Sequence, residues 1–152
     1  MSNLYDTDFY AWTQAQATAL AAGHVTELDL ANLAEEIGSL GKNDLRALRS
    51  NLRVMLLHLL KWRHQPERRQ DSIDEHRTRI QDIVADSPSL ALQVQELLPQ
   101  AYRQARRLAA QQTQLPPGIF PDTCPWTVDE VLDPEFWPEI VGATRPDGGR
   151  VD

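Results

Sequence analysis

The sequence has a single cysteine, Cys124, no long apolar run and no basic N-terminal segment. One cysteine excludes an internal disulfide and suits a reducing compartment. No stretch approaches the roughly 18 consecutive apolar residues that span a bilayer. The first ten residues, MSNLYDTDFY, lack the basic segment and the apolar run of a secretory signal. We therefore expect a cytoplasmic protein that does not contact a membrane.

Positive charge is missing from residues 1–41, which hold six acids and neither Lys nor Arg. Residues 42–80 hold ten bases and five acids, residues 113–152 hold two bases and eight acids, and the whole chain has a net charge of −7. A basic middle between acidic ends fits a nucleic-acid surface, or helices that neutralise one another. We favour neutralisation, because a phosphate-binding domain usually has net positive charge.

Apolar residues recur at spacings of three and four along most of the chain, which predicts amphipathic helices. A length of 152 residues suits one core, so we expect one helical domain over 1–142 and a mobile, glycine-rich tail over 143–152. The expected helices run from a cap at Asp6 or Thr7 to Ala22, from about Asp29 to a break at Gly38 or Gly41, from about Asn43 to Gln65, from about Asp71 to Ala85, and onward from Ser87 and Pro88 with a kink or a division at Pro99.

The third of these helices contains VMLLHLLKW (54–62), which is apolar except at its middle and its lysine. Leu57 and Leu60 occupy the sector that arginines hold earlier in the helix, so this helix must be covered on more than one side. After it, LPPGIFPDTCPW (115–126) predicts an extended segment, TVDE (127–130) a capping box, and Asp133 with Pro134 a final turn. The expected fold class is all-α: a compact bundle of about five helices around a central apolar helix, with an extended proline-rich C-terminal segment and one or two short helices.

His58 lies in the middle of the apolar run, and it has two interpretations. A neutral histidine held by hydrogen bonds in the core is the ordinary one, because burial of a charged imidazole is costly. The other is a small acid–base pocket, because a carboxylate beside a histidine can tune its proton transfer. Asn51 and Trp62 share the flank of His58. Asp29, Asn32 and Glu36 form a polar flank of the preceding helix, beside its apolar stripe of Leu30, Leu33, Ala34, Ile37 and Leu40.

Arginines form a second face on the central helix and continue beyond its end, and they are a candidate binding surface. The alternative, which we favour, is internal pairing with Asp29, Glu36 or the acidic C-terminal segment, since arginine forks suit carboxylates. The residues concerned are Arg46, Arg49, Arg53, Arg63, Arg68 and Arg69.

Spacings typical of metal sites and nucleophiles are absent. The four histidines form no Glu-x-x-His, His-x-x-x-His or HExxH pair. GSLGK (38–42) lacks the full phosphate-loop spacing, and Cys124 within a proline-rich segment suggests an apolar contact. We predict no metal site, no cofactor and no catalytic triad.

Five segments carry a resemblance to a known family: YDTDFYAW (5–12), LDLANLAEEIGSLGK (28–42), LLHLLKWRHQPERR (56–69), DSPSL (86–90) and FPDTCPWTVDEVLDPEFWP (120–138). In this order they resemble the domain of unknown function 29 family. The resemblance implies a bacterial, all-helical protein with no assigned activity, so it transfers no catalytic residue. Members of that family often have a tryptophan shortly after the arginines of QPERR, where this chain has Ile73.

The main functional hypothesis is a non-enzymatic, cytosolic binding or regulatory module that acts through a protein partner. Leu57, Leu60 and the aromatic C-terminal segment would offer surface for self-association if they are not all buried. Two alternatives stay open: a hydrolase or transferase built on His58, Glu36 and Asp29, and nucleic-acid binding through the arginines.

Overall fold

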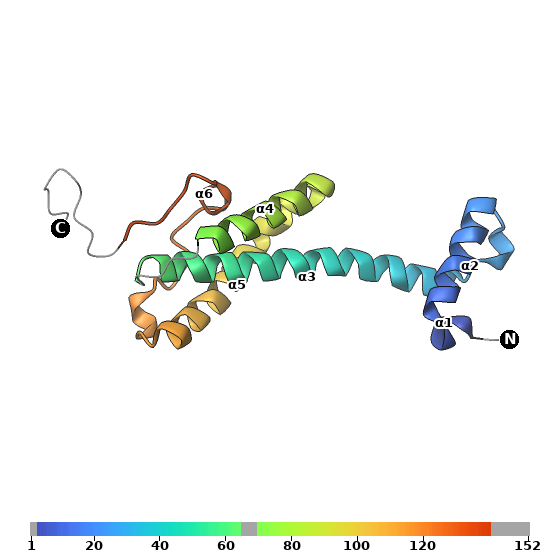
Figure 1. Ribbon diagram of the computed structural model, residues 1–152, viewed down its shortest axis with the longest axis horizontal. Coiled ribbons are helices and arrows are strands. Elements are labelled where there is room, and N and C mark those ends of the chain that lie inside the picture. Colours follow the sequence, from blue (N-terminus) through green and yellow to red (C-terminus); the bar gives the residue numbers. More distant parts are fainter. Residues whose placement is uncertain (1–2, 65–69, 141–152) are drawn as a thin grey trace, which may run out of the picture. The chain divides into compact units, whose positions relative to one another are not determined.

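The computed structural model describes residues 3–64 and 70–140, and all the regular structure in these ranges is helical. The predicted all-α class is confirmed. No helix in the described ranges is long and apolar enough to cross a membrane. The elements are α1 (Leu4–Thr7), α2 (Phe9–Ala22), the 3-10 turn η1 (Val25–Glu27), α3 (Leu30–Trp62), α4 (Gln70–Asp86), η2 (Pro88–Leu90), α5 (Ala91–Thr113), η3 (Pro117–Ile119) and α6 (Val128–Leu132) (Figure 1).

Contacts along the chain define two compact units, an N-terminal unit (1–43) and a C-terminal unit (44–152). Helix α3 begins in the first unit and ends in the second. Each unit is described by itself, and the expectation of one domain over 1–142 stays a prediction. The predicted tail over 143–152 lies outside the described residues.

The expected break at Gly38 or Gly41 is wrong, because α3 continues through both glycines. A glycine costs roughly 1 kcal/mol relative to alanine inside a helix. Apolar and long polar residues that favour the helix on both sides outweigh that cost. The two helices predicted over about 29–65 are therefore one, and it ends at Trp62, before Pro66.

The first predicted helix is divided near its start. The side chain of Asp8 accepts a hydrogen bond from the Ala11 amide at 3.0 Å, so Asp8 caps α2 in place of the expected Asp6 or Thr7. The predicted end is confirmed, because Gly23 follows the helix with a φ of 72°, a conformation that favours glycine.

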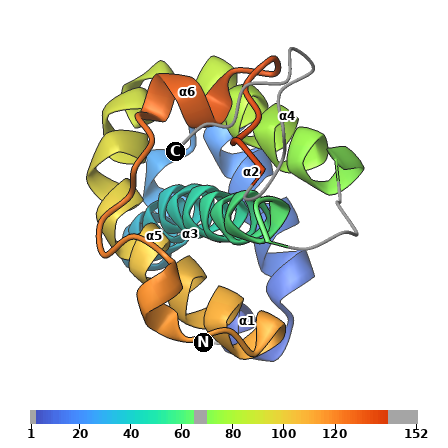
Figure 2. The ribbon, with the colours of Figure 1, turned by 90° about the vertical axis from the view of Figure 1, so that its left-hand side faces the viewer.

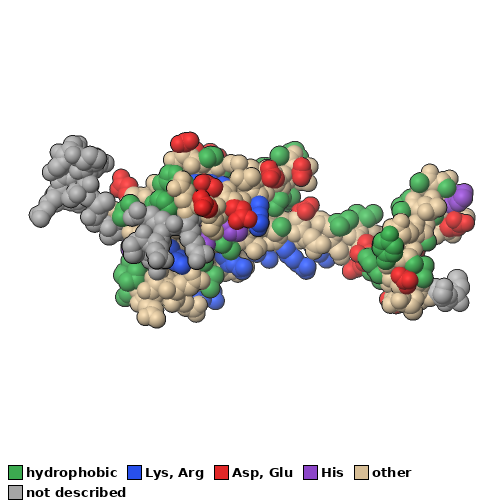
Figure 3. Space-filling view, viewed as in Figure 1, with side chains coloured by type: hydrophobic (Ala, Val, Ile, Leu, Met, Phe, Trp, Pro, Cys, Tyr) green, Lys and Arg blue, Asp and Glu red, His purple; other side chains and the backbone are tan. Residues whose placement is uncertain are grey.

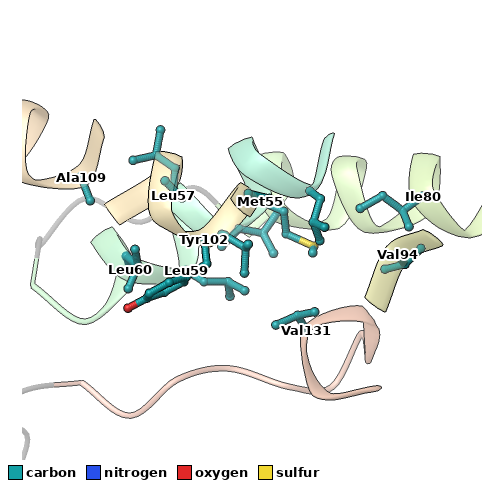
Figure 4. Packing of buried hydrophobic residues seen from close by; sticks show 14 of the residues in the cluster. Met55, Leu57, Leu59, Leu60, Ile80, Val94, Tyr102, Ala109 and Val131 are labelled. Carbon is teal, nitrogen blue, oxygen red and sulfur yellow. The ribbon is translucent and has the colours of Figure 1, made fainter. Parts of the chain in front are cut away.

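The core of the C-terminal unit forms where α4, α5 and α6 surround the second half of α3 (Figure 2). Met55, Leu59 and Leu60 of α3 belong to one core cluster with Tyr102 of α5 and Val131 of α6 (Figure 4). Leu57 and Leu60 are only 6% and 1% exposed, as expected for a helix that is covered on several sides. Leu57 and Leu60 therefore do not meet the condition of exposure on which their predicted role in self-association depended.

Helix α5 runs without division through Pro99, so of the two alternatives expected there the division into two helices is wrong, and the kink stays a prediction. Proline leaves the carbonyl of Gln95 without its helical partner, and exposed Gln95 can turn that oxygen to water. Ser87 and Pro88 open the short turn η2 instead of α5 itself.

The proline-rich segment after α5 is irregular apart from η3, close to the extended form predicted, and it lies against α5. The Tyr102 hydroxyl donates to the Pro121 carbonyl at 2.5 Å, and Nε of Arg106 donates to the Phe120 carbonyl at 3.2 Å. Phe120 is buried. The capping box of Thr127 and Glu130 on α6 is confirmed, and a turn follows at Asp133.

Candidate functional site

Asp29, one of the predicted pocket residues, organises the junction between α2 and α3. Its carboxylate accepts hydrogen bonds from Nδ2 of Asn32 at 2.7 Å and from Nε1 of Trp12 at 3.1 Å. These bonds, led by the one from Asn32, lower the pKa of Asp29, whereas burial acts in the opposite direction. Gln16 accepts from the Asp29 amide at 2.8 Å. Asp29 therefore fastens α3 to α2.

Glu36, which lies further along α3 than Asp29, also holds a preceding helix. It accepts a hydrogen bond from the Tyr5 hydroxyl, and this bond raises the Tyr5 pKa to about 12, with burial adding to the effect. Tyr5 also meets Trp12 edge to face, with ring centroids 4.9 Å apart. The polar flank of α3 thus binds the aromatic residues of α1 and α2.

This docking has a geometric consequence for the apolar stripe of α3. At 100° per residue, Asp29 and Glu36 lie roughly 100° to 120° from Leu30 on the helical wheel, whereas Ile37 lies only about 20° from it. Helices α1 and α2 cover the polar flank and leave the stripe open. Leu30, Ile37 and Leu40 are each 66% exposed.

His58, Asn51 and Trp62 lie in the C-terminal unit, whereas Asp29, Asn32 and Glu36 lie in the N-terminal unit. His58 is half-buried, as are Asn51 and Trp62. The six predicted pocket residues therefore fall into two groups.

Asn51 pairs with a histidine, but with His76 of α4. Nδ1 of His76 lies 2.7 Å from Oδ1 of Asn51, and Asn51 donates through Nδ2 to the Ala47 carbonyl at 2.8 Å. That bond assigns the amide orientation, so His76 donates from Nδ1. Burial, with the charge of Arg79, lowers the His76 pKa, against a smaller opposite effect of Glu75. His76 is therefore a neutral, structural partner of α3.

Arg77, beside His76, is 2% exposed and was not identified from the sequence. It donates from Nε to the Val131 carbonyl at 2.8 Å and from Nη2 to the Phe136 carbonyl at 2.7 Å. Its guanidinium lies 4.9 Å from the Trp137 ring, which stacks on Trp62 at 4.5 Å. Predicted site residue Trp62 is thus part of a cluster that holds the C-terminal segment. No spacing in the sequence signals these pairings.

The arginine face, which we define as Arg46, Arg49 and Arg53 of α3, lies in the C-terminal unit. Figure 3 shows Lys and Arg side chains gathered along one side of this helix. Arg46 is exposed, and Arg49, Arg53 and the following Arg63 are half-buried. Arg68 and Arg69 lie outside the described residues.

Three of these arginines have an unsatisfied donor. Nε of Arg49, Arg53 and Arg63 is enclosed by protein atoms and has no hydrogen-bond partner. Within the described ranges, the ion pairs involve Arg77, Arg79, Arg106 and His24, and none joins these arginines to the expected Asp29, Glu36 or C-terminal acids. Arg49 and Arg53 of the arginine face therefore each have a donor that the described residues leave unsatisfied.

A cavity of about 650 Å³ lies between α4, α5 and α6. Val84, Val94 and Leu132 line the cavity with apolar side chains, and Gln81 and Gln95 line it with polar ones. Asp129 is the one ionisable residue in this lining. Among the described residues that line the cavity there is thus no pair of ionisable groups for proton transfer.

Cys124 is not placed as a nucleophile. Burial raises the pKa of its thiol, and the thiol donates to the Trp126 carbonyl at 3.4 Å. The described residues contain no group of three His, Cys, Asp or Glu side chains that could hold a metal ion.

The helices and side chains described above define an all-α protein whose most distinctive surfaces are an apolar stripe and an arginine face. The chain belongs to the family described as domain of unknown function DUF29, whose sequence model matches residues 4–137. Comparisons with curated proteins and with solved structures gave no match.

Proposed function

We propose that this chain is a cytoplasmic, non-enzymatic binding module that docks an acidic protein segment on its arginine face. The observation that carries the proposal is the unsatisfied Nε of Arg49 and Arg53, with that of Arg63 beyond the helix end. An enclosed donor without an acceptor is costly. When such a side chain turns out towards a partner, a carboxylate accepts from Nε and from one Nη together, which removes that cost.

The partner class follows from the charge of the whole chain. The chain has a net charge of −7 and a pI near 5.0. A long polyanion such as a nucleic acid would extend past the arginine face and be repelled by the negative charge of the rest of the chain. A short run of Asp and Glu side chains on a protein can contact the arginines without extending over the negatively charged remainder of the chain. An acidic protein surface is therefore favoured over nucleic acid.

The test uses fluorescent polyglutamate and a single-stranded oligonucleotide of equal charge as probes. The variant R49Q/R53Q removes two guanidinium groups, and we expect it to weaken polyglutamate binding at least about tenfold. R49K/R53K retains the charge but not the fork, and should restore only part of the affinity.

The matched control is R79Q/R103Q, which removes two exposed arginine charges from α4 and α5. It should bind polyglutamate as the wild-type chain does. Equal weakening by R79Q/R103Q would contradict a specific arginine face. Tighter binding of the oligonucleotide, with a steep loss of affinity as salt increases, would replace the proposal with nucleic-acid binding.

The hydrolase or transferase alternative stays a prediction. Its carboxylates, Asp29 and Glu36, are engaged by Trp12, Asn32 and Tyr5. These bonds favour a role in holding α1 and α2, which is why the binding function is preferred.

A further inference from the structure

The cavity between α4, α5 and α6 lies within the C-terminal unit, and none of its lining residues belongs to the arginine face. We infer that this cavity binds a small organic amine, which carries a protonated ammonium group on an apolar body. The ammonium group lies beside Asp129, and the apolar body packs against the aliphatic side chains of the lining. This site is separate from the function proposed above.

The size and the apolar part of the cavity suit a small molecule. Its volume of about 650 Å³ falls in the range of roughly 300–1,000 Å³ that is usual for ligand pockets. Val84 of α4, Val94 of α5 and Leu132 of α6 line it, so the walls come from the three helices that surround this end of α3 (Figure 2). Burial of an apolar body against these side chains provides affinity without fixing an orientation.

The polar groups of the lining that lack partners are hydrogen-bond acceptors. Gln81 donates through Nε2 to the Leu132 carbonyl at 2.9 Å, which leaves its Oε1 to accept. Asp129 is exposed and forms no ion pair with a described residue. Gln95 carries the carbonyl that Pro99 leaves without a helical donor. An ammonium group has three donors and no acceptor, so it complements these groups.

The charge around the cavity favours a cation over an anion. Every lining residue falls within 81–102 or 108–140, and these two stretches hold three and six acids, with neither Lys nor Arg. Figure 3 shows Asp and Glu side chains over α4 and α6. Arg77 contacts α6 through the Val131 carbonyl but is not part of the lining. The local field therefore attracts a positive group, and Asp129 in the lining fixes where that group lies.

Calorimetric titration of the full chain with n-octylamine, n-octanol and n-octanoate tests the chemistry of the ligand. These probes have the same chain length and differ in the charge of the head group. We expect n-octylamine to bind with a dissociation constant of about 1 mM or tighter. Octanoate should bind at least about tenfold more weakly, because its charge is repelled. Octanoate that binds as tightly as octylamine would overturn the inference.

D129N tests the position of the ammonium group, because it removes the charge and keeps the size of the side chain. We expect octylamine to bind about tenfold more weakly, whereas octanol should bind as it does to the wild-type chain and so show that the cavity is intact. The matched control is E135Q, which neutralises an exposed acid outside the lining. Unchanged octylamine binding in D129N, or an equal loss in E135Q, would contradict the role of Asp129 and overturn the inference.

A91F and L92F test the position of the apolar body. Ala91 is an exposed lining residue, whereas its neighbour Leu92 is 72% exposed and lies outside the lining. A phenylalanine at 91 occupies the cavity, so A91F should bind neither octylamine nor octanol, and L92F should bind both as the wild-type chain does. Circular dichroism checks that each variant is helical. Octylamine binding that persists in A91F would place the amine elsewhere and overturn the inference.

A lysine side chain of another protein carries the same ammonium group, and Nα-acetyl-lysine methylamide distinguishes this source. Its shorter stem buries less apolar area, so it should bind at least about tenfold more weakly than octylamine. Tighter binding of the lysine derivative would replace the small amine with a protein partner and overturn the inference. R49Q/R53Q should bind octylamine as the wild-type chain does, so the amine site and the arginine face can fail independently.

Discussion

At the scale of single residues, Arg77 connects α4 to the C-terminal segment through the carbonyls of Val131 and Phe136. Replacement by alanine leaves both oxygens without their donor and removes the cation beside the Trp137 ring. We expect R77A to lower the free energy of unfolding by about 3 kcal/mol, measured by urea denaturation.

The comparison is R79A, two residues further along α4. Arg79 is exposed, and its ion pair with Glu75 is a surface pair one turn apart. Such pairs contribute roughly 0 to 1 kcal/mol. If R77A were no more destabilising than R79A, the described bonds of Arg77 would not hold the C-terminal segment.

His76 predicts a pH dependence of stability. Burial first, and then Arg79, lowers its pKa below the ordinary 6.5 in the folded chain. As the pH falls below about 6.5, the unfolded chain binds the proton first, so the free energy of unfolding decreases. H76N keeps a donor to Asn51 but does not titrate, and urea denaturation from pH 7.5 to 5 should show a smaller decrease.

His64 behaves in the same direction, because burial and then Arg63 lower its pKa. The acid sensitivity of H76N is therefore reduced and not abolished. If the free energy of unfolding of H76N decreased with pH as much as that of the wild-type chain, the titration of His76 would not contribute to the acid sensitivity.

These residue pairs show the limit of sequence reasoning. The helical wheel places His58, Asn51 and Trp62 on one flank of α3, and it places Asp29 and Glu36 on the polar flank. It does not give the neighbour that each flank meets. Pairs such as Asn51 with His76 depend on how helices distant in sequence cross, which residue spacing does not encode.

At the scale of elements, α3 contains two glycines that its structure does not require. Gly38 and Gly41 have no positive φ, and a Cβ at either position meets nothing within 4 Å. Alanine at each should raise the free energy of unfolding by roughly 0.5–1 kcal/mol. Thermal melting followed by circular dichroism measures the change.

Gly23 is the opposing control. Its φ is 72°, so G23A should lower stability even though the space around it is open. A loss of stability in G38A or G41A would mean that α3 bends or opens at these glycines.

Local chemistry explains which elements were predictable. The cap at Gly23 and the box of Thr127 and Glu130 are formed by residues near in sequence, so their signals were sufficient. The break expected at Gly38 or Gly41 and the division into two helices, one of the two alternatives at Pro99, were wrong because a breaker costs only a few kcal/mol at most. The packing of the whole helix exceeds that cost.

At the scale of the whole molecule, the all-α class and the covered central helix follow from apolar periodicity and are confirmed. The apolar stripe of the N-terminal part of α3 follows the same rule but remains exposed. Periodicity identifies an apolar face that would be stabilised by burial, but it does not say whether the same chain supplies the surface that buries it. In the same way, the spacing of the arginines does not say which acidic groups pair with them.

The docking of α1 and α2 on the polar flank of α3 also determines the thermodynamic character of the N-terminal unit. Hydrogen bonds to Asp29 and Glu36 hold it, and little apolar surface leaves water when it forms. The heat capacity of unfolding arises mainly from apolar exposure. Unfolding of this unit in an isolated chain should therefore be accompanied by only a small change in heat capacity. The free energy of unfolding of the unit should then show little curvature with temperature, including at low temperature.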